Sequence, residues 1–539
     1  MADKTGQPTF NIGDLFDEIA TAIPERPALV WSDDCLSYGE LADRSDRLAN
    51  TLLKHGVKRG DRVGFYLHNC TAYIVGLLAT FKIGAIYFNI NYRYVADELN
   101  QIVADAGARA LVHGAEFADS VSLLRKQCPN LAVTVSVYQP EDPRPDTDDS
   151  IDYDYATSGE IDHEAISSGR SGDDQLLIYT GGTTGQPKGV LWTQEDLFFA
   201  ALGGGGQMHP EGPITKPEQI GERAKSSPPV AILATSPLMH GAAMWGSLIA
   251  LLGGLKLVLT DTHKFDAEAI WGLVESERIT ALSTTGDAMA APLLEALEAN
   301  PGRWSLDSLM VKSWGGAPMT ESFRNRFRDH FPHIQLLSGL GSTESGQSGS
   351  GNLDTGGDGF MIMAPREDLA VIKDDRNMAE PGEMGIMART GHLPQGYWND
   401  PEKTAETFIM VDGKRWVLTG DSAKLEPDGS LRLYGRDSNT INSGGEKIFA
   451  EEVEEVVRSH PSVRDAVVTS VADERWGQAV VAIAETTGDD DLELEDLRMF
   501  CGEKLARYKL PKRLVVVEQI PRTPVGKAKM EEIRHLAKT

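Results

Sequence analysis

Residues 179–190 read Tyr-Thr-Gly-Gly-Thr-Thr-Gly-Gln-Pro-Lys-Gly-Val, so four glycines, three threonines and Lys188 fall within twelve positions. Glycine lets a backbone turn sharply and point its N–H groups at an anion. Threonine hydroxyls and a lysine ammonium add short donors and one mobile positive charge. The flanking residues 175–179 and 189–192 are strand-like, so the stretch predicts a phosphate-binding loop at the tip of a β-hairpin.

This loop is not a Walker A loop. Gln186 and Pro187 separate Gly185 from Lys188, and a further glycine follows the lysine. A glycine-rich turn without a ligand is the alternative interpretation. The paired threonines and the Pro-Lys-Gly ending favour phosphate binding over that alternative.

The bulk composition limits what the protein can be. The chain has 539 residues, 41% of them apolar, and its 80 acidic and 52 basic residues give a formal charge of −28. The length predicts two or three domains, and the apolar content is typical of soluble globular proteins. Such an acidic surface repels nucleic acid and anionic membranes, so local donors must hold any bound nucleotide.

The cysteines and the apolar runs bear on location. Four scattered cysteines, without metal-binding spacing, are expected to be reduced in a cytoplasmic protein. The N-terminus has no apolar signal core. The most apolar run, 241–260, contains Gly253-Gly254 and Lys256, so it predicts a buried helix followed by a strand and no transmembrane segment.

Strand and helix patterns alternate along the first part of the chain. Ser37-Tyr-Gly-Glu40 is a capping box that opens a helix ending at Gly56. Strands are expected at 62–67, 85–88, 110–112 and 230–233, and a helix at 72–81. The alternation predicts α/β layers with mostly parallel sheets. Two polar segments, 141–174 and 203–229, are expected to be irregular.

The composition changes near residue 435. The remaining chain is expected to form helices at 451–458 and 493–505, strands at 466–471, 479–485 and 513–517, and a last helix. This content is enough for a small domain. We therefore predict a large α/β domain over 1–435 and a small mobile α+β domain over 436–539, with a hinge near 436–439.

The loop resembles the phosphate loop of the adenylate-forming superfamily, which contains acyl-CoA synthetases, peptide-synthetase adenylation domains and luciferases. Gly181 stands where that family usually has serine. The family's other motifs occur in order as far as Lys527, and the N-terminal α/β region also fits, so the resemblance covers essentially the whole chain. It implies ATP and CoA as substrates and Mg²⁺ as the metal. It places these residues at the nucleotide phosphates: Thr180, Gly181, Gly182, Thr183, Thr184, Gly185 and Lys188.

Two glycine motifs resemble the rest of the family's nucleotide site. Trp314-Gly-Gly-Ala-Pro318 follows an apolar run, and its glycines would let a flat ring approach the backbone, although a tight turn is the alternative. By resemblance, Gly315, Gly316 and Ala317 line the adenine. Gly339-Leu-Gly-Ser-Thr-Glu344 resembles the motif whose threonine contacts a phosphate and whose glutamate helps hold Mg²⁺. The resemblance implies nucleotide contacts from Gly339, Leu340, Gly341 and Ser342, a phosphate contact from Thr343, and metal binding by Glu344 with Thr183.

Individual residues of these motifs leave alternatives open. Leu340 replaces the tyrosine that commonly stacks on adenine, so apolar contact must replace stacking. An isolated Thr-Glu pair would ordinarily start a helix.

The ribose and CoA residues follow later in the chain. Asp421 comes after a strand and a glycine turn, and in the family this aspartate accepts both ribose hydroxyls with help from Arg436. The segment 436–454 resembles the family's hinge and thiolation motif. Ser438 stands at the usual pivot position, and Ser443, Gly444 and Gly445 are expected to border the CoA arm. A plain turn residue and a plain linker are the alternatives.

The catalytic residues implied by the resemblance are Lys527, Thr343, Glu344 and His240. Pro521-Arg-Thr-Pro-Val-Gly-Lys527 resembles the motif whose lysine bridges the acyl carboxylate and the α-phosphate, where a mobile ammonium suits developing charge. A solvated surface lysine is the alternative. His240 is expected beside the reacting carboxylate without a proton-transfer role, and a buried structural histidine is its alternative.

The resemblance predicts an AMP-forming acyl-CoA ligase of fatty acid or other lipid metabolism. A carrier-linked adenylation domain would continue beyond Thr539, so free CoA is the expected acceptor. The segments 91–95, 181–182 and 444–453 most resemble a bacterial branch acting on fatty acids and steroid side-chain acids. The segment 239–245 is small and apolar and has no Lys or Arg, which favours a medium-chain, long-chain or polycyclic acid.

Other functions stay open at this point. They are a ligase for an aromatic or other small acid, and a non-catalytic homologue that binds acyl groups or nucleotides. The retained charged residues of the motifs argue against the non-catalytic homologue. The sequence leaves the oligomeric state open, including a homodimer.

Overall fold

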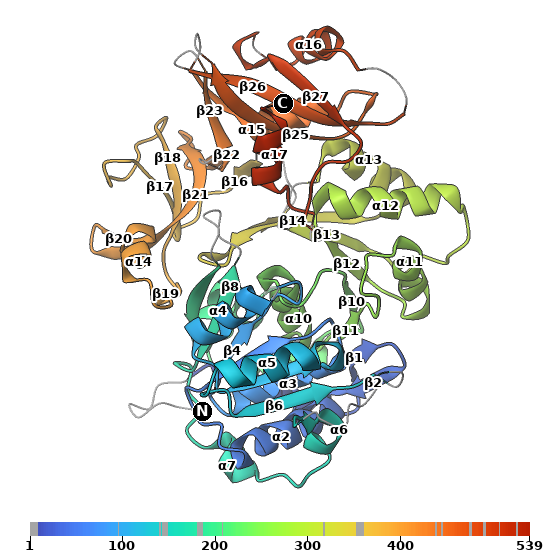
Figure 1. Cartoon of the computed structure of the whole chain (residues 1–539), viewed down its shortest axis with the longest axis vertical. Helices are drawn as coiled ribbons and strands as arrows, with labels where there is room; N and C mark the ends of the chain where they lie inside the picture. The colour runs from blue at the N-terminus through green and yellow to red at the C-terminus, as the bar shows by residue number, and fades with distance from the viewer. Residues whose placement is uncertain are drawn as a thin grey trace.

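The computed structural model describes most of the chain. The described residues are 9–94, 96–139, 142, 149–180, 187–206, 209–315, 319–351, 361–436, 439–443, 446–473, 477–488, 492–505, 507–523 and 526–538. Their strands form four sheets: two largely parallel, one antiparallel and one C-terminal (Figure 1). In the described part of the chain, no helix combines the length and the apolar character that crossing a bilayer requires.

The first parallel sheet has the order β19-β9-β8-β4-β3-β5-β6-β7. Its strands are β3 (Arg62–Tyr66), β4 (Ile86–Asn89), β5 (Ala110–Gly114), β6 (Val133–Val137), β7 (Ile151–Asp152), β8 (Gln175–Thr180), β9 (Lys188–Thr193) and β19 (Gly396–Tyr397). Only β9 and β19 run antiparallel to their neighbours. Helices α4 (Ala96–Ala106) and α5 (Ala118–Gln127) contact each other beside this sheet.

The second parallel sheet has the order β15-β14-β13-β12-β10-β11-β1-β2. Its strands are β1 (Pro27–Trp31), β2 (Asp34–Ser37), β10 (Ala231–Ala234), β11 (Lys256–Leu259), β12 (Ala281–Thr284), β13 (Val311–Gly315), β14 (Gln335–Ser342) and β15 (Gly346–Gly351). The helices that alternate with its inner strands are α10 (Gly241–Leu252), α11 (Ala267–Ser276), α12 (Gly286–Ala299) and α13 (Glu321–His330). The predicted helix and strand over 241–260 are therefore confirmed as α10 and β11.

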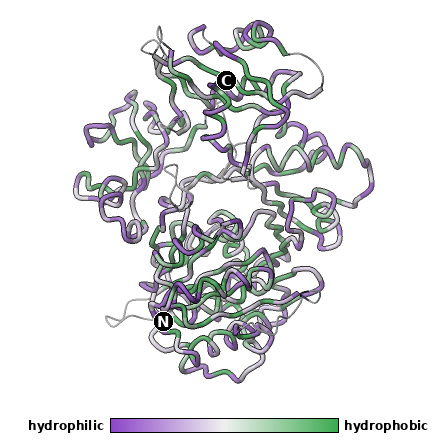
Figure 2. Tube along the Cα trace, in the orientation of Figure 1, coloured by the Kyte–Doolittle hydropathy of each residue, from purple (hydrophilic) through white to green (hydrophobic). Residues whose placement is uncertain are grey.

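Three helices of the first hundred residues pack together between the sheets. They are α1 (Ile12–Ala22), α2 (Tyr38–Lys54) and α3 (Thr71–Lys82). The predicted capping box is present, because Ser37 Oγ accepts from the Glu40 N–H at 3.2 Å and Glu40 Oε2 accepts from the Ser37 N–H at 2.8 Å. Every residue of α3 is buried, and α3 contacts β4 of one sheet and β1 of the other. Figure 2 shows that apolar stretches lie mainly in the interior of the molecule. Polar stretches lie mainly in the outer helices and loops.

The antiparallel sheet departs from the prediction of mostly parallel sheets. It contains β16 (Met361–Met363), β17 (Leu369–Ile372), β18 (Met384–Arg389), β20 (Phe408–Val411), β21 (Lys414–Leu425) and β22 (Leu431–Arg436). β20 and β21 are joined by the two-residue turn Asp412-Gly413, with φ of 50° and 74°, and β21 and β22 by residues 426–430, so neither connection contains a crossover helix. Such short connections allow only antiparallel pairing.

The C-terminal sheet, at the top of Figure 1, is separate from the other three. Its strands are β23 (Thr440–Ser443), β24 (Glu446–Phe449), β25 (Val463–Asp473), β26 (Gly477–Thr486) and β27 (Arg513–Val517). Its helices are α15 (Ala450–Arg458), α16 (Leu494–Gly502) and α17 (Met530–Leu536), with a short η4 (Arg507–Lys509). Strand pairing passes from the antiparallel sheet to this one between Arg436 and Thr440, and Ser438 lies outside the described residues.

The two segments expected to be irregular contain helices. They hold α6 (Tyr153–Ala156), α7 (His163–Ser167), η2 (Gly203–Gly205) and α9 (Gln219–Ser226). Helix α9 forms because it buries Ile220, Gly221 and Ala224, and it contacts α1. This packing is tertiary, so the polar local composition did not reveal it. The remaining elements are η1 (Ala115–Phe117), α8 (Gln194–Ala200) and α14 (Pro401–Thr407).

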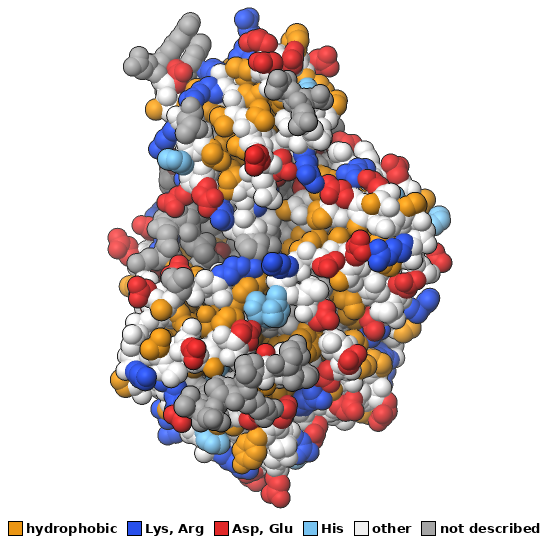
Figure 3. Space-filling view, turned by 45° about the vertical axis from the view of Figure 1, so that its right-hand side comes forward, with side chains coloured by type: hydrophobic (Ala, Val, Ile, Leu, Met, Phe, Trp, Pro, Cys, Tyr) orange, Lys and Arg blue, Asp and Glu red, His pale blue; other side chains and the backbone are white. Residues whose placement is uncertain are grey.

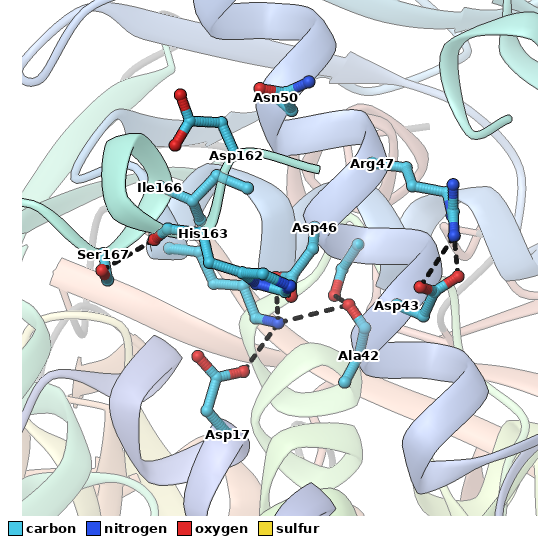
Figure 4. A network of polar contacts seen from close by, with 12 residues as sticks. Asp17, Ala42, Asp43, Asp46, Arg47, Asn50, Asp162, His163, Ile166 and Ser167 are labelled. Atoms are coloured by element: carbon cyan, nitrogen blue, oxygen red, sulfur yellow. Dashed lines mark hydrogen bonds and ion pairs between the residues drawn. The ribbon is translucent and has the colours of Figure 1, made fainter. Parts of the chain in front are cut away.

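Charges are distributed in two ways. On the face drawn in Figure 3, acidic and basic side chains are interspersed. Inside, Lys82 at the end of α3 is fully buried, and its Nζ lies 2.7 Å from Asp17 Oδ1 of α1 and 2.6 Å from Asp46 Oδ1 of α2. Figure 4 shows these two aspartates converging from different helices. Arg170 extends the network by pairing with Asp14 at 3.0 Å and Asp17 at 2.6 Å.

This buried network predicts a large effect of one substitution. Lys82→Met should lower the free energy of unfolding by about 3–5 kcal/mol, because it leaves the mostly buried carboxylate of Asp46 without its lysine, whereas Asp17 keeps Arg170. The exposed pair Lys225–Glu222 supplies a control, and Lys225→Met should change stability by less than about 0.5 kcal/mol. Urea unfolding followed by circular dichroism measures both, and equal shifts would contradict the role assigned to the network.

Candidate active site

The predicted phosphate loop joins β8 and β9. These strands pair antiparallel, with Thr180 directly opposite Lys188, so the predicted hairpin is confirmed at both of its ends. The loop residues Gly181, Gly182, Thr183, Thr184 and Gly185 lie outside the described residues. The structure thus fixes where the loop leaves the sheet and where it returns.

Lys188 is paired at the end of the loop. Its Nζ lies 2.7 Å from Asp400 Oδ2, and hydrogen bonding to Lys188 lowers the pKa of that carboxyl below its ordinary value. Asp400 also caps α14 by accepting from the Lys403 N–H at 2.9 Å. It follows β19, whose Tyr397 pairs with Val190 of β9. A strand from far along the chain therefore sets the lysine's position.

Thr343 and Glu344 lie in the tight turn between β14 and β15, not at the start of a helix. Trp192 Nε1 donates to the Thr343 carbonyl at 2.9 Å, and Tyr397 Oη donates to Glu344 Oε1 at 3.0 Å. Burial and then the charge of Glu344 raise the pKa of Tyr397. Lys188 Nζ lies 5.8 Å from the Tyr397 ring centre, so these hydroxyl, carboxylate and ammonium groups form one cluster.

Two glycines lie opposite each other where the pairing of β13 with β14 ends. Gly315 of β13 is in register with Gly339 of β14, and a Cβ on Gly315 would lie 3.4 Å from the Gly339 carbonyl oxygen. Gly316 and Ala317 lie outside the described residues. Leu340 packs against the apolar cluster of the antiparallel sheet. Gly341 follows it in β14, where a Cβ would lie 2.3 Å from the Gly346 carbonyl oxygen, so only glycine fits without a shift.

The end of β14 is held by hydroxyl groups. Ser342 Oγ lies 3.1 Å from Ser345 Oγ, and the Ser345 N–H donates to Ser342 Oγ at 3.2 Å. These bonds close the turn that carries Thr343 and Glu344. The serine of the motif therefore shapes the turn in this structure.

Asp421 and Arg436 occupy opposite backbone positions in two paired strands. They are register partners in the antiparallel pair β21–β22, so the fourteen residues between them close a hairpin. The expectation that Asp421 follows a strand is wrong, because β21 continues to Leu425. Gly420 has a positive φ of 77° but does not end the strand. β21 continues past it because β21 pairs with β18 on one side and with β22 on the other.

His240 and Lys527 come together from opposite parts of the chain. His240 precedes α10 and is partly buried, and its pKa is lowered to about 4 by burial and by the charges of Lys527 and Arg93. Lys527 is exposed and belongs to a tight hairpin, in which the Thr523 N–H donates to its carbonyl at 2.7 Å. His240 is therefore neutral at pH 7, with a cation nearby.

Asn89 is a buried site residue that the motifs did not indicate. Its Nδ2 donates to the Tyr179 carbonyl at 2.9 Å and to the Met239 carbonyl at 2.7 Å, while its Oδ1 accepts from the Tyr179 N–H at 2.7 Å. It thereby joins the root of the phosphate loop to the His240 segment. Its place at the carboxyl end of β4 is the signal that could have found it, because ligands bind at such edges. Tyr397, Asp400 and Arg93 were also missed.

Ser443 lies elsewhere in this arrangement. It ends β23, pairs with Gly477, and accepts from Lys512 Nζ at 3.0 Å within the C-terminal sheet. Gly444 and Gly445 lie outside the described residues. The described part of the chain holds no group of three or more His, Cys, Asp or Glu side chains arranged for a metal ion.

Comparisons with known proteins agree over the whole chain. The model of the AMP-binding enzyme family matches residues 16–398, and that of the AMP-binding enzyme C-terminal domain matches 452–527. The 3-oxocholest-4-en-26-oate–CoA ligase of Rhodococcus rhodochrous is 35% identical over 536 residues, covering 96% of this chain and 94% of that protein. The medium-chain acyl-CoA ligase Mig of Mycobacterium avium is 36% identical, with 98% of both chains covered.

A solved structure has the same fold. The anthranilate CoA ligase AuaEII, in complex with anthranoyl-AMP, superposes with a TM-score of 0.82 at 21% identity, covering 100% of this chain and 99% of that one. The predicted α/β fold with its additional C-terminal sheet is thus confirmed. The chain belongs to the AMP-binding enzyme family, as an AMP-forming acid–CoA ligase of the adenylate-forming superfamily that acts on an acid, ATP and CoA.

Proposed function

We propose that the chain activates an apolar medium-chain, long-chain or steroid side-chain acid as an acyl-adenylate, with Lys527 as the cation at the reacting centre. The observation that carries the chemistry is that the charge of Lys527 acts on His240, which follows Met239, the residue that Asn89 joins to Tyr179 at the root of the phosphate loop. For the acid, the support is the printed names of the two relatives and the composition of α10. That helix buries Ala243, Met244 and Trp245 and carries no charged residue.

The first half-reaction needs no general base. A carboxylic acid with a pKa of about 4–5 is already ionised at pH 7, so its oxygen can attack the α-phosphate while pyrophosphate leaves. His240, with its pKa lowered to about 4, is a poor base in this range and serves as a neutral wall beside the carboxylate. Lys527 supplies the positive charge that offsets the negative charge on the pentavalent phosphorus centre.

The phosphates are held at the loop. Lys188 is positioned by Asp400, and both loop ends leave paired strands. We propose that Thr180, Thr183, Thr184 and the loop glycines donate to the β- and γ-phosphates, and that Thr343 donates to the α-phosphate. The adenine would lie against Gly315, Gly316 and Ala317, with Leu340 as an apolar neighbour.

The ribose and the metal have acceptors of suitable chemistry. Asp421 would accept both ribose hydroxyls beside Arg436. Glu344 suits Mg²⁺, because it is a carboxylate at the cluster of Lys188 and Tyr397, and Mg²⁺ in nucleotide sites takes one or two carboxylates together with phosphate oxygens. When bound, Mg²⁺ neutralises the leaving pyrophosphate. Glu344, with Thr183, would hold it.

In the second half-reaction the CoA thiol attacks the acyl carbonyl and AMP leaves. We propose that the chain divides into 1–435 and 436–539 and turns at 436–439 between the two steps, which brings Ser443, Gly444 and Gly445 to the CoA arm. The change of sheet between Arg436 and Thr440 supports this hinge. A homodimer and a cytoplasmic location stay predictions.

The first test separates the two half-reactions. Lys527→Ala should slow adenylate formation by about 10²–10³-fold, because one preorganised cation is lost, and should leave thioester formation from supplied acyl-adenylate near the wild-type rate. Lys529→Ala, which removes an exposed lysine paired with Glu532, is the matched control. An equal loss in both half-reactions would exclude the role proposed for Lys527.

The second test concerns the acid. Each buried methylene should contribute about 0.8 kcal/mol, which is a gain of about fourfold in kcat/KM until the pocket is full. Rates of acyl-CoA formation with acetate, octanoate, palmitate, benzoate, succinate and a steroid side-chain acid measure the trend. If acetate, benzoate or succinate were the best substrate, the apolar pocket would be wrong and the adenylation chemistry would stand.

The third test concerns His240. Since its pKa is about 4, against an ordinary value of 6.5, the imidazole stays neutral from pH 5.5 to pH 8 and gains a proton only as the pH falls toward 4. His240→Asn should therefore leave the shape of the rate profile for adenylate formation unchanged over that range, whatever its absolute rate. If the wild-type rate of adenylate formation changed with pH near 6.5 and the rate of the variant did not, His240 would have to exchange a proton in the reaction.

A further inference from the structure

Four charged side chains connect the start of α12 to the hairpin that carries Lys527. They are Asp287 in α12, Arg458 at the end of α15, Asp465 in β25, and Arg522 at the start of the hairpin. We call these four residues the ion-pair chain. It crosses from the second parallel sheet to the C-terminal sheet, whose relative orientation decides where Lys527 lies.

The contacts along the ion-pair chain become shorter toward Lys527. Arg458 Nη1 lies 3.7 Å from Asp287 Oδ2, and Arg458 Nε lies 3.4 Å from Asp465 Oδ1. Arg522 then binds Asp465 with two bonds of 2.7 Å and donates to the Gly526 carbonyl at 2.8 Å. Such a two-pronged contact fixes orientation as well as distance. The carbonyl that Arg522 holds belongs to the residue directly before Lys527.

The far end of the ion-pair chain is also fixed. Asp287 Oδ1 accepts from the Thr320 N–H at 2.8 Å, which leaves Oδ2 without a hydrogen bond among the described residues and on the side of Arg458. The two side chains are 11% and 10% exposed, so salt screens their attraction less than it screens a surface pair. Burial raises the pKa of Asp287 to about 6, and the charge of Arg458 opposes that rise.

The hairpin also contacts α12 directly, at the turn of the helix that carries Asp287. Gly526 has a φ of 80°, and a Cβ there would lie 2.7 Å from Ala288 Cβ. The hairpin therefore rests on the residue next to Asp287. A second ion pair between these parts in the described residues, Arg464 with Glu295 at 2.9 Å, is about half exposed and is expected to contribute little.

We propose that Asp287 and Arg458 are positioning residues that hold the C-terminal sheet in the orientation for adenylate formation. They touch no substrate and act through Lys527, because a displacement of about 1 Å at a reacting group costs about 10²-fold in rate. This inference rests on the proposed function of Lys527. It assigns a role in the first half-reaction only, since thioester formation would use another orientation.

The test uses a variant that removes charge and keeps shape. Asp287→Asn retains an acceptor for the Thr320 N–H. It should slow pyrophosphate release with acid, ATP and Mg²⁺ by about 10–100-fold, while thioester formation from supplied acyl-adenylate and CoA stays within about twofold of wild type. Arg458→Gln should behave alike. Glu295→Gln, which breaks the exposed pair, should leave both half-reactions unchanged. The second half-reaction also reports that each variant is folded.

A double-mutant cycle distinguishes positioning from general support. If Asp287 acts through Lys527, Asp287→Asn adds little further loss in the Lys527→Ala background. Additive losses, equal losses in both half-reactions, or no loss in Asp287→Asn would each overturn the inference. If Lys527→Ala slows only adenylate formation and Asp287→Asn does not show this selective loss, the inference alone fails. If Lys527→Ala slows both equally, the proposed function of Lys527 fails and the inference falls with it.

Discussion

A buried asparagine side chain joins the two halves of the site. The amide of Asn89 binds Tyr179 of β8 through two bonds and the Met239 carbonyl before α10 through a third. A buried amide left without partners would be costly, so these bonds strongly favour one distance between the two segments. The loop that should hold phosphate and the helix that should border the acid therefore meet at one edge. The rest of the site is arranged around this contact.

An acidic protein that binds an anionic nucleotide must concentrate its cations locally. The formal charge is −28, yet Lys188, Arg93 and Lys527 gather at the site from three separate segments. Each is placed by a different device: an ion pair with Asp400 for Lys188, stacking on Tyr92 for Arg93, and a tight hairpin for Lys527. Burial, together with the charges of Lys527 and Arg93, lowers the pKa of His240 and keeps it neutral. The local charge therefore opposes the charge of the whole chain where a phosphate would bind.

Among the described residues, the large part meets the C-terminal sheet through contacts that include the ion pairs of Asp287 with Arg458 and of Glu295 with Arg464, the close contact at Gly526, and stacking of Tyr434 on Phe449. Interfaces of this kind allow relative motion of the parts that they join. Buried charge pairs are poor sources of net stability but good determinants of orientation, because removing one partner is costly. The ion-pair chain therefore suits the proposed mechanism, in which one orientation is held for the first half-reaction and released for the second.

Local sequence determined the parts of this protein whose structure depends on short-range chemistry. The glycine-rich hairpin, the capping box, the helix and strand over 241–260 and the α/β alternation were all predictable, because turn residues, caps and apolar periodicity act over a few residues. Motif resemblance indicated most of the residues that are proposed for the site. Tertiary structure alone decided the antiparallel sheet, helix α9, the continuation of β21 through Asp421, and the partners Asn89, Tyr397, Asp400 and Arg458. Their positions depend on contacts between residues far apart in sequence, and local residue patterns carry no record of which distant segments meet.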